Sequence, residues 1–340
     1  EDPNDVPDID DSDGDCECPE EEPGCTPNPE CRTELVPAFQ AWWWRRVDFL
    51  RDNGSTAVLT GHRGYGQVVA TEAMQVAVQR GREYRVAAVG VTDLTHIGRL
   101  ADYAVLASEA GLIGMVFTST GGFSKLVAPF GGSERRMSTN PMAVAFPSDR
   151  AAPVVFDFAS SAYAEGKFRV FSDAHTATPP NILIDKDGRP STDPEDLYRG
   201  GAILPLGGEQ GYKGYLLNFM MEVLGGLLTG GGFVGKEEHP PFNNCSLMLV
   251  LDVSAFRELP AFKAELERLI AYLQAAGVAP GGEVLYPGEK EARSEARRRA
   301  QGIPLAETTI RNLQGEMQRY GVPGDLLAEG QPAPEATWKY

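Results

Sequence analysis

The sequence contains no apolar run long enough to cross a bilayer. A membrane-spanning helix needs about 20 consecutive apolar residues, and none of the apolar stretches in these 340 residues is that long. The chain also lacks the basic and then apolar beginning of a signal peptide, since its first residues are acidic. These absences predict a soluble, cytoplasmic protein with no membrane partner.

Positive charge is missing from the beginning of the chain. Thirteen Asp and Glu residues precede Arg32, and no Lys or Arg lies among them. Because this segment carries most of the formal net charge of −17, the remainder is only mildly acidic. No part of the chain offers the basic surface that neutralises phosphates, so nucleic acid is not expected as a partner. Residues 1–31 have the composition of a disordered acidic tail, and residues 326–340 are expected to be frayed.

Cysteine is scarce in the rest of the chain: Cys245 is the only cysteine outside this tail. The spacing of Cys16, Cys18, Cys25 and Cys31 fits no common zinc pattern, so free thiols, local disulfides and metal binding all remain open for them. The tail segment "IDDSDGDCECPE" is close to a calcium loop, but its first position is not acidic and no helices flank it. We therefore assign no metal ligand.

Apolar periodicity predicts an α+β fold. Buried strands are expected over residues 84–92, 112–119 and 243–253, and helices over about 68–82 and from His96 to just before Gly111. Residues 211–230 are apolar nearly all round, which predicts a buried helix. Strands and helices do not alternate strictly, which favours a mixed sheet over a doubly wound one. The G-x-G-x-x-G pattern of the Rossmann fold is absent.

Histidine is rare, and His96 is the one that we single out. It is followed by Arg99, and a helix N-terminus and a nearby cation both disfavour the imidazolium, so we expect an uncharged ring able to accept a hydroxyl proton. A guanidinium can hold a carboxylate bidentately. Together they predict half of a 2-hydroxy-acid site; the alternative is that His96 only caps or packs. His62, His175 and His239 lie in turns or polar loops and receive no catalytic role.

Five segments carry a family resemblance, in order, between about Thr56 and Val322. They are "THIGRLADYAVLASEAGLIGMVF", "STNPMAVAFP", "PVVFDFASSAYAEGK", "STDPEDLYRGGAILPLGGEQGYKGYLL" and "VLYPGEKEARSEARRRAQGIPL". Together they resemble the malate/L-lactate/sulfolactate dehydrogenase family, a type without a Rossmann fold that includes ureidoglycolate dehydrogenase and diketogulonate reductase. The resemblance implies a homodimer in which an α+β domain with a mixed sheet binds NAD or NADP, beside a helical or α+β companion domain.

The resemblance also implies roles for individual residues. His96 and Arg99 of "HIGR" would be catalytic, and Arg63 or Arg99 would bind the substrate carboxylate. The cofactor would be held by Ser119, Thr120, Asp157, Phe158, Ala159, Ser160, Ser161, Lys213, Gly288 and Glu289. Residues 119–289 would form the NAD(P)-binding domain, and residues 32–118 with 290–325 the catalytic and dimerisation domain.

One element of that family is missing. Relatives carry a Ser-His-Gly segment before the Gly-rich turn, whereas this chain reads "EEPGCTPNPECRTEL", without histidine. The expected function is hydride transfer between NAD(P) and a small 2-hydroxy or 2-oxo acid of malate, lactate, sulfolactate or ureidoglycolate type. The alternatives are a catalytically impaired NAD(P)-binding scaffold and, from the tail alone, a calcium-binding module.

Overall fold

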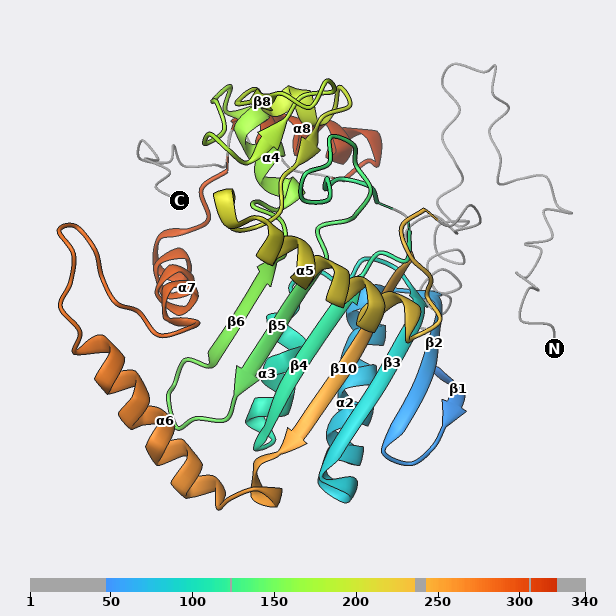
Figure 1. The fold of residues 1–340 in the computed structure, drawn as a ribbon, viewed down its shortest axis with the longest axis vertical. Coiled ribbons are helices and arrows are strands. Elements are labelled where there is room, and N and C mark those ends of the chain that lie inside the picture. The colour runs from blue at the N-terminus through green and yellow to red at the C-terminus, as the bar shows by residue number, and fades with distance from the viewer. Residues whose placement is uncertain (1–46, 123, 236–242, 306, 323–340) are drawn as a thin grey trace, which may run out of the picture.

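A seven-stranded mixed sheet forms the centre of the molecule (Figure 1). The structure is a computed structural model and describes residues 47–122, 124–235, 243–305 and 307–322. In spatial order the strands are β1 (Asp48–Asp52), β2 (Thr56–Gly64), β3 (Val86–Leu94), β10 (Asn244–Asp252), β4 (Leu112–Ser119), β5 (Pro141–Phe146) and β6 (Val154–Ala159). The acidic tail with its cysteines, His239 and the frayed C-terminus of the sequence prediction fall outside the described residues.

The strand directions bring several chain segments to one edge of the sheet. Strands β2 and β3 are parallel, β10 is antiparallel to both β3 and β4, and β5 is antiparallel to β4 and β6. The carboxyl ends of β2, β3, β4 and β6 therefore lie together with the amino ends of β5 and β10. We call this edge, at the top of the sheet in Figure 1, the upper edge; it is marked by Gly64, Leu94, Ser119, Ala159, Pro141 and Asn244.

Helices α2 (Gly66–Tyr84) and α3 (Ala101–Glu109) cover one face of the sheet. Small residues line the inner side of α2, and a side chain at Gly81 would come within 2.5 Å of Val250 on β10, so the helix packs very close to the strands. Fully buried side chains such as Leu59 and Met74 fill this layer. Each contributes about 1.5–3 kcal/mol by leaving water.

Helix α5 (Tyr212–Met221) covers the opposite face and continues into the π-helical turn η3 (Glu222–Leu227). Its inner side packs on β4 and β10 through Met221, Phe117 and Leu247. The prediction of a helix buried all round was wrong for the outer side, where Leu216 is 58% and Phe219 56% exposed. The sheet covers only one side of the helix, and in the described part of the chain no second layer lies over the other.

A smaller unit sits above the upper edge. It holds β7 (Leu183–Ile184), β8 (Pro190–Ser191), β9 (Ala202–Ile203) and α4 (Glu165–Asp173). A separate core, which includes Val127, Phe168, Leu183, Leu197 and Ile203, stabilises it. The main sheet takes strands from both segments that the sequence assigned to separate domains, and that division stays a prediction.

Three helices complete the described chain: α6 (Leu259–Gln274), α7 (Glu289–Gln301) and α8 (Glu307–Arg319). The mixed sheet with helices on both faces confirms the predicted α+β class. None of the described helices combines the length and the apolar character needed to cross a membrane.

Candidate active site

The upper edge gathers most of the residues that the sequence analysis selected. Arg63 lies near the end of β2, His96 follows β3, Ser119 ends β4, and Asp157 lies on β6 two residues before its end. The loop after β3 is joined there to the end of β2 and to the start of α2, because Oγ1 of Thr95 donates to the carbonyl of Gly64 at 3.1 Å and accepts the backbone N–H of Gly66 at 2.8 Å. The topology of one sheet therefore places segments far apart in sequence beside one another.

The end of β2 is irregular where it reaches this edge. Thr60 pairs with Thr92 but Gly64 pairs with Leu94, so β2 holds two extra residues. His62 and Arg63 lie there with φ of 47° and 59°, a left-handed conformation that costs side-chain-bearing residues energy. Such strain concentrates at functional sites. Arg63 is exposed and lies at the same edge as His96.

The backbone at His96 is fixed by a close approach to helix α2. A Cβ on Gly66 would come within 2.3 Å of the carbonyl oxygen of Thr95 and 2.5 Å of that of His96, so only glycine fits there. His96 itself is exposed, and its Nδ1 accepts a hydrogen bond from the backbone N–H of Gly98 at 3.1 Å. In a neutral ring the hydrogen then lies on Nε2.

The prediction that His96 starts a helix was wrong. Helix α3 begins at Ala101, five residues later, and the carboxylate of Asp157 accepts the backbone N–H of Ala101 at 2.9 Å. An anion thus already occupies the helix start, so the helix argument for an uncharged His96 does not hold. What the structure offers in its place is the Gly98 contact, which selects a tautomer.

The two candidate substrate-binding arginines are both exposed. Nη2 of Arg99 forms an ion pair with Oδ1 of Asp102 at 2.7 Å, and both side chains are more than half exposed. Such a pair is weak in water, so a substrate carboxylate can replace Asp102 as the partner. Arg63 lies near the half-buried Asp93, whose pKa is raised by burial, while the charges of Arg63 and His62 oppose that rise.

Asp157 links strand β6 to the start of helix α3. Shielding of its carboxyl from water raises the pKa of Asp157, and the N–H groups of Ala101 and Leu100 oppose this rise. The carboxylate therefore fixes the start of α3, directly after Arg99. Next to it, Phe158 and Ala159 are partly exposed, and the ring of Phe158 lies 5.7 Å from that of Phe156.

Three of the predicted cofactor-binding hydroxyls are buried and already bonded. Ser119 Oγ donates to Glu222 Oε2 at 3.1 Å, Ser160 Oγ to the carbonyl of Asn140 at 2.9 Å, and Ser161 Oγ to the carbonyl of Tyr163 at 2.8 Å. These side chains hold the loops at the upper edge. Thr120, in contrast, is only partly buried.

Lys213 lies in the first turn of α5 and is exposed, with Nζ 5.8 Å from the centre of the Tyr212 ring. Its helix reaches the upper edge through Leu206, whose backbone N–H donates to the carbonyl of Ser160 at 2.9 Å. A Cβ on Gly214 would meet the Leu206 carbonyl at 2.2 Å. The start of α5 is therefore held close to the end of β6.

The "PGE" loop lies elsewhere, beside the first residues of β6. The backbone N–H of Val155 donates to the carbonyl of Pro287 at 3.1 Å, and Gly288 caps α7 with φ of 95°. Partial burial disfavours ionisation of Glu289, but the N–H of Tyr286 and the guanidinium of Arg293 outweigh it and lower the pKa of that carboxyl. The structure does not bring Gly288 and Glu289 to the upper edge.

The sequence analysis missed a buried polar cluster at the same edge. Asn140 Nδ2 donates to Glu222 Oε2 at 2.5 Å and to Asn218 Oδ1 at 2.9 Å, and Asn218 Nδ2 donates to the carbonyl of Ser138 at 2.7 Å. The signal was present, because Asn218 and Glu222 are polar residues inside an otherwise apolar helical segment. Buried polar residues in such a context require partners.

Unpaired buried side-chain atoms also point to this edge. Within the described chain, the buried side-chain oxygens without a partner are Gln67 Oε1, Asn140 Oδ1 and Asn243 Oδ1. Gln67 touches the position of a Cβ on Gly98, Asn140 precedes β5 and Asn243 precedes β10. Unsatisfied groups of this kind are rare in native proteins and call for an explanation such as a ligand or bound water.

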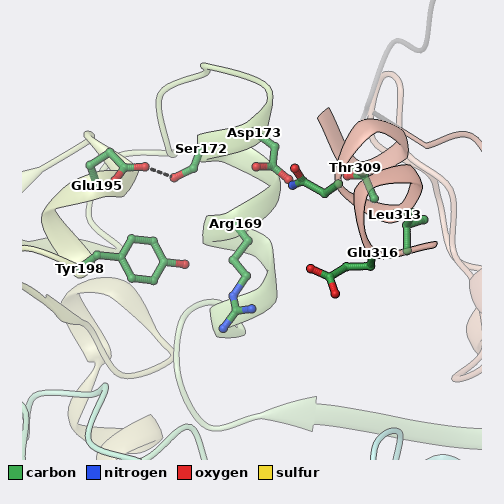
Figure 2. A pocket seen from close by; sticks show the side chains of 9 residues that line it. Arg169, Ser172, Asp173, Glu195, Tyr198, Thr309, Leu313 and Glu316 are labelled. Carbon is green, nitrogen blue, oxygen red and sulfur yellow. Dashed lines mark hydrogen bonds between the residues drawn. The ribbon is translucent and has the colours of Figure 1, made fainter. Parts of the chain in front are cut away.

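A cavity of about 510 Å³ lies between the smaller unit and α8, and none of the predicted residues lines it. Figure 2 shows Glu316 of α8 pointing toward α4, while Arg169 runs along its own helix α4, where it pairs with Glu165, and Ser172 is bonded to Glu195 at one side. Among the described residues, no group of three or more His, Cys, Asp or Glu side chains could hold a metal ion.

Comparison with known proteins gives one family. Residues 44–314 match the family model of malate/L-lactate dehydrogenases. The chain is 36% identical to L-sulfolactate dehydrogenase of Methanothermobacter thermautotrophicus over 78% of this chain and 75% of that protein. It is 32% identical to hydroxycarboxylate dehydrogenase B of Escherichia coli K12 over 86% and 83%.

Solved structures agree. Malate dehydrogenase from Entamoeba histolytica superposes with a TM-score of 0.76 at 29% identity, over 86% of this chain and 85% of the other. The fold of this chain is thus similar to that of a solved malate dehydrogenase. This chain belongs to the malate/L-lactate dehydrogenase family.

Proposed function

We propose that the chain is an NAD(P)-dependent dehydrogenase of small 2-hydroxy acids, with its active site at the upper edge. Family membership supports a dehydrogenase of 2-hydroxy acids in general, and the named relatives act on sulfolactate, malate, lactate or hydroxycarboxylates. One observation carries the location: all the unpaired buried side-chain oxygens of the described residues lie at the edge that also holds His96, Arg63 and Arg99.

The residues at this edge fit a nicotinamide dinucleotide. The unpaired oxygens of Asn140, Asn243 and Gln67 are acceptors, and the ribose hydroxyls and carboxamide of NAD or NADP are donors. Thr120, Phe158 and Ala159 offer partly exposed groups, and Lys213 offers a cation at the start of α5. When bound, the cofactor supplies hydride chemistry, and the protein orients the reactants.

The substrate carboxylate would be held by Arg99 or Arg63. A guanidinium binds a carboxylate through two parallel hydrogen bonds, which fixes the orientation of the acid as well as its charge. Without substrate, Arg99 pairs with the exposed carboxylate of Asp102. With the carboxylate held by Arg99, the C2 oxygen would come to the ring of His96, because both residues lie in the loop after β3.

His96 would act on the C2 oxygen through Nε2. With Nδ1 accepting from Gly98, the neutral ring presents Nε2–H, the form that donates a hydrogen bond to the carbonyl of a 2-oxo acid. To accept the proton of a 2-hydroxy acid at Nε2, the ring must carry its hydrogen on Nδ1. A neutral ring cannot give its Nε2 hydrogen to the C2 oxygen as a proton, because imidazolate would remain; the proton donor is the imidazolium, which also carries a hydrogen on Nδ1. The contact with Gly98 must therefore open for proton transfer in either direction, and the geometry as it stands suits hydrogen-bonded binding of the oxo acid.

A homodimer would cover the exposed side of α5. Tyr212, Leu216, Phe219 and Leu228 expose large apolar side chains along α5 and the turn that follows η3. Contiguous apolar surface of this kind marks interaction sites in soluble proteins. A second copy is the partner that the family resemblance implies, and the cytoplasm remains the predicted location.

Binding and turnover tests distinguish the proposals. NADH and NADPH should quench or shift protein fluorescence on binding, and a panel of 2-oxo acids of lactate, malate and sulfolactate type should then oxidise the bound cofactor. Binding without oxidation of any acid would support the impaired scaffold, in keeping with the absent Ser-His-Gly element. Failure of both cofactors to bind would overturn both proposals.

A further inference from the structure

Among the described residues, no cation forms an ion pair with the buried carboxylate of Glu222. Glu222 is 9% exposed. Its Oε2 accepts hydrogen bonds from Ser119 Oγ and Asn140 Nδ2, and its Oε1 accepts one from the backbone N–H of Val234 at 2.6 Å. A buried carboxylate needs such donors, since removing it from water is costly. Every one of these donors comes from a different segment of the chain.

Directly or through one neighbour, Glu222 is linked to three segments that the resemblance assigns to the cofactor. Ser119 ends β4 and precedes Thr120. The backbone carbonyl of Asn140 accepts both the N–H and Oγ–H of Ser160, so the bond from Asn140 to Glu222 fixes the end of β6 as well. Glu222 itself continues the helix that begins beside Lys213.

The backbone around Glu222 supports this junction. Residues 222–227 form a π-helical turn, a rare geometry that often occurs at functional sites. A Cβ on Gly225 would meet the carbonyl oxygen of Phe117 and the N of Ser119 at 2.9 Å, so the turn lies directly on the end of β4. Glu222 is therefore held in place by its own backbone before it orients the neighbouring segments.

We propose that Glu222 is a positioning residue for the cofactor. By joining the ends of β4 and β6 to α5 it sets the spacing of the segments that hold the dinucleotide, without touching substrate or cofactor itself. This inference rests on the proposed function. It predicts that a change at Glu222 weakens cofactor binding far more than it slows the chemical step.

The sheet supplies a matched control at its opposite edge. Asp252 at the end of β10 is 8% exposed, and its carboxylate bonds Ser254 N at 2.8 Å and Arg85 Nη1 at 2.7 Å. Asp252→Asn and Glu222→Gln each replace one buried carboxylate by its amide. Both variants should therefore unfold at a lower Tm than the wild type, but only one of them lies at the upper edge.

The test compares NADH and NADPH dissociation constants from fluorescence titration with steady-state kinetics. Glu222→Gln should raise Kd and KM for the cofactor about tenfold and change kcat at saturating cofactor less than about twofold. Asp252→Asn should leave Kd within about twofold of the wild type despite its lower Tm. Should Glu222→Gln not fold, Ser119→Ala removes a single donor and should raise Kd about threefold.

The outcomes separate the two proposals. If Glu222→Gln binds the cofactor as tightly as the wild type, the role of Glu222 is overturned and the proposed function stands. The same holds for Ser119→Ala if that variant is tested instead. An equal rise in Kd for Glu222→Gln and Asp252→Asn would likewise overturn it, because loss of stability would then explain both. If the wild type binds neither NADH nor NADPH, the proposed function fails, and the inference fails with it.

Discussion

Nδ1 of His96 accepts the backbone N–H of Gly98, so the hydrogen of the neutral ring lies on Nε2 and faces away from the chain's own loop. The ring is exposed, it follows the strand next to the irregular end of β2, and its backbone is fixed against Gly66. This contact, and not a helix start, leaves Nε2–H of the imidazole oriented to donate a hydrogen bond to the oxygen of a bound substrate.

Replacing His96 should therefore remove proton exchange while leaving binding intact. His96→Asn should lower kcat for oxo-acid reduction about 10²–10⁴-fold, the usual contribution of general acid–base catalysis, with a cofactor Kd like that of the wild type. His175→Asn is the matched control, since His175 is also exposed and also lies in a loop. A wild-type rate in His96→Asn would exclude the histidine from the mechanism.

Loss of a substrate-binding guanidinium should appear in KM. Charge-assisted hydrogen bonds contribute about 1.5–3 kcal/mol. Replacing the arginine that holds the carboxylate, by Arg99→Gln or by Arg63→Gln, should therefore raise KM for the oxo acid about tenfold or more. Arg189→Gln, which breaks an exposed ion pair with Asp187 in the smaller unit, should leave KM unchanged. If neither Arg99→Gln nor Arg63→Gln alters KM, the carboxylate is bound elsewhere.

The role of Asp157 at the start of α3 can be tested by stability. Asp157→Ala removes the acceptor for the N–H of Ala101 and should lower the free energy of unfolding by about 1 kcal/mol, as loss of a helix cap does. Asp157→Asn keeps an acceptor oxygen and should lose much less. Urea unfolding of both variants measures the difference, and equal losses would contradict the capping role.

The buried thiol of Cys245 should make the fold sensitive to alkali. Burial raises the pKa of Cys245 from 9.0 to about 12, so between these pH values the folded chain holds a proton that the unfolded chain releases. Stability is therefore complete below about pH 9 and falls as the pH rises toward 12. Cys245→Ala should flatten this part of the curve of unfolding free energy against pH; an unchanged slope would refute the assignment.

The same burial should protect Cys245 from chemical modification. The thiolate is the reactive form, and it is scarce at neutral pH when the pKa is high. Peptide mapping after alkylation at pH 7.5 should find Cys245 modified only in denaturant. Modification of the native protein at the rate of a free thiol would contradict the buried position.

The homodimer is tested on the outer side of α5. Phe219→Glu places a charge in the exposed apolar face and should shift the protein toward monomer in sedimentation velocity. Tyr272→Glu on α6 changes a side chain that is 77% exposed and should leave the dimer intact. A wild-type protein that sediments as a monomer, or a Phe219→Glu variant that stays dimeric, would refute this interface.

Local pattern was enough to predict individual elements. The strand over residues 112–119 has the predicted bounds, and the α+β class is confirmed. Both could be predicted because apolar periodicity and turn residues act over a few positions along the chain. The family was identified correctly from five short segments. The strand bounds, the fold class and the family motifs all depend on residues that are close together in the sequence.

Long-range contacts account for what the sequence missed. Helix α3 starts at Ala101 and not at His96 because a carboxylate from β6, 56 residues away, caps it. The hydroxyls of Ser119 and Ser160 bond inward because Glu222 and Asn140 come to the same edge. Apolar composition predicted that α5 is buried all round, but its outer side is exposed because the sheet covers only its inner side. Composition alone does not show which side of a helix is covered.

The position of β10 has a consequence for how the chain folds during synthesis. Strands β1–β2–β3 and β4–β5–β6 form two half-sheets with no pairing between β3 and β4, and β10 is hydrogen-bonded to both. Its residues 244–252 emerge from the ribosome more than a hundred residues after β4. A half-sheet that forms before β10 is synthesised has an open edge of unpaired backbone groups, and such an edge favours pairing with other chains.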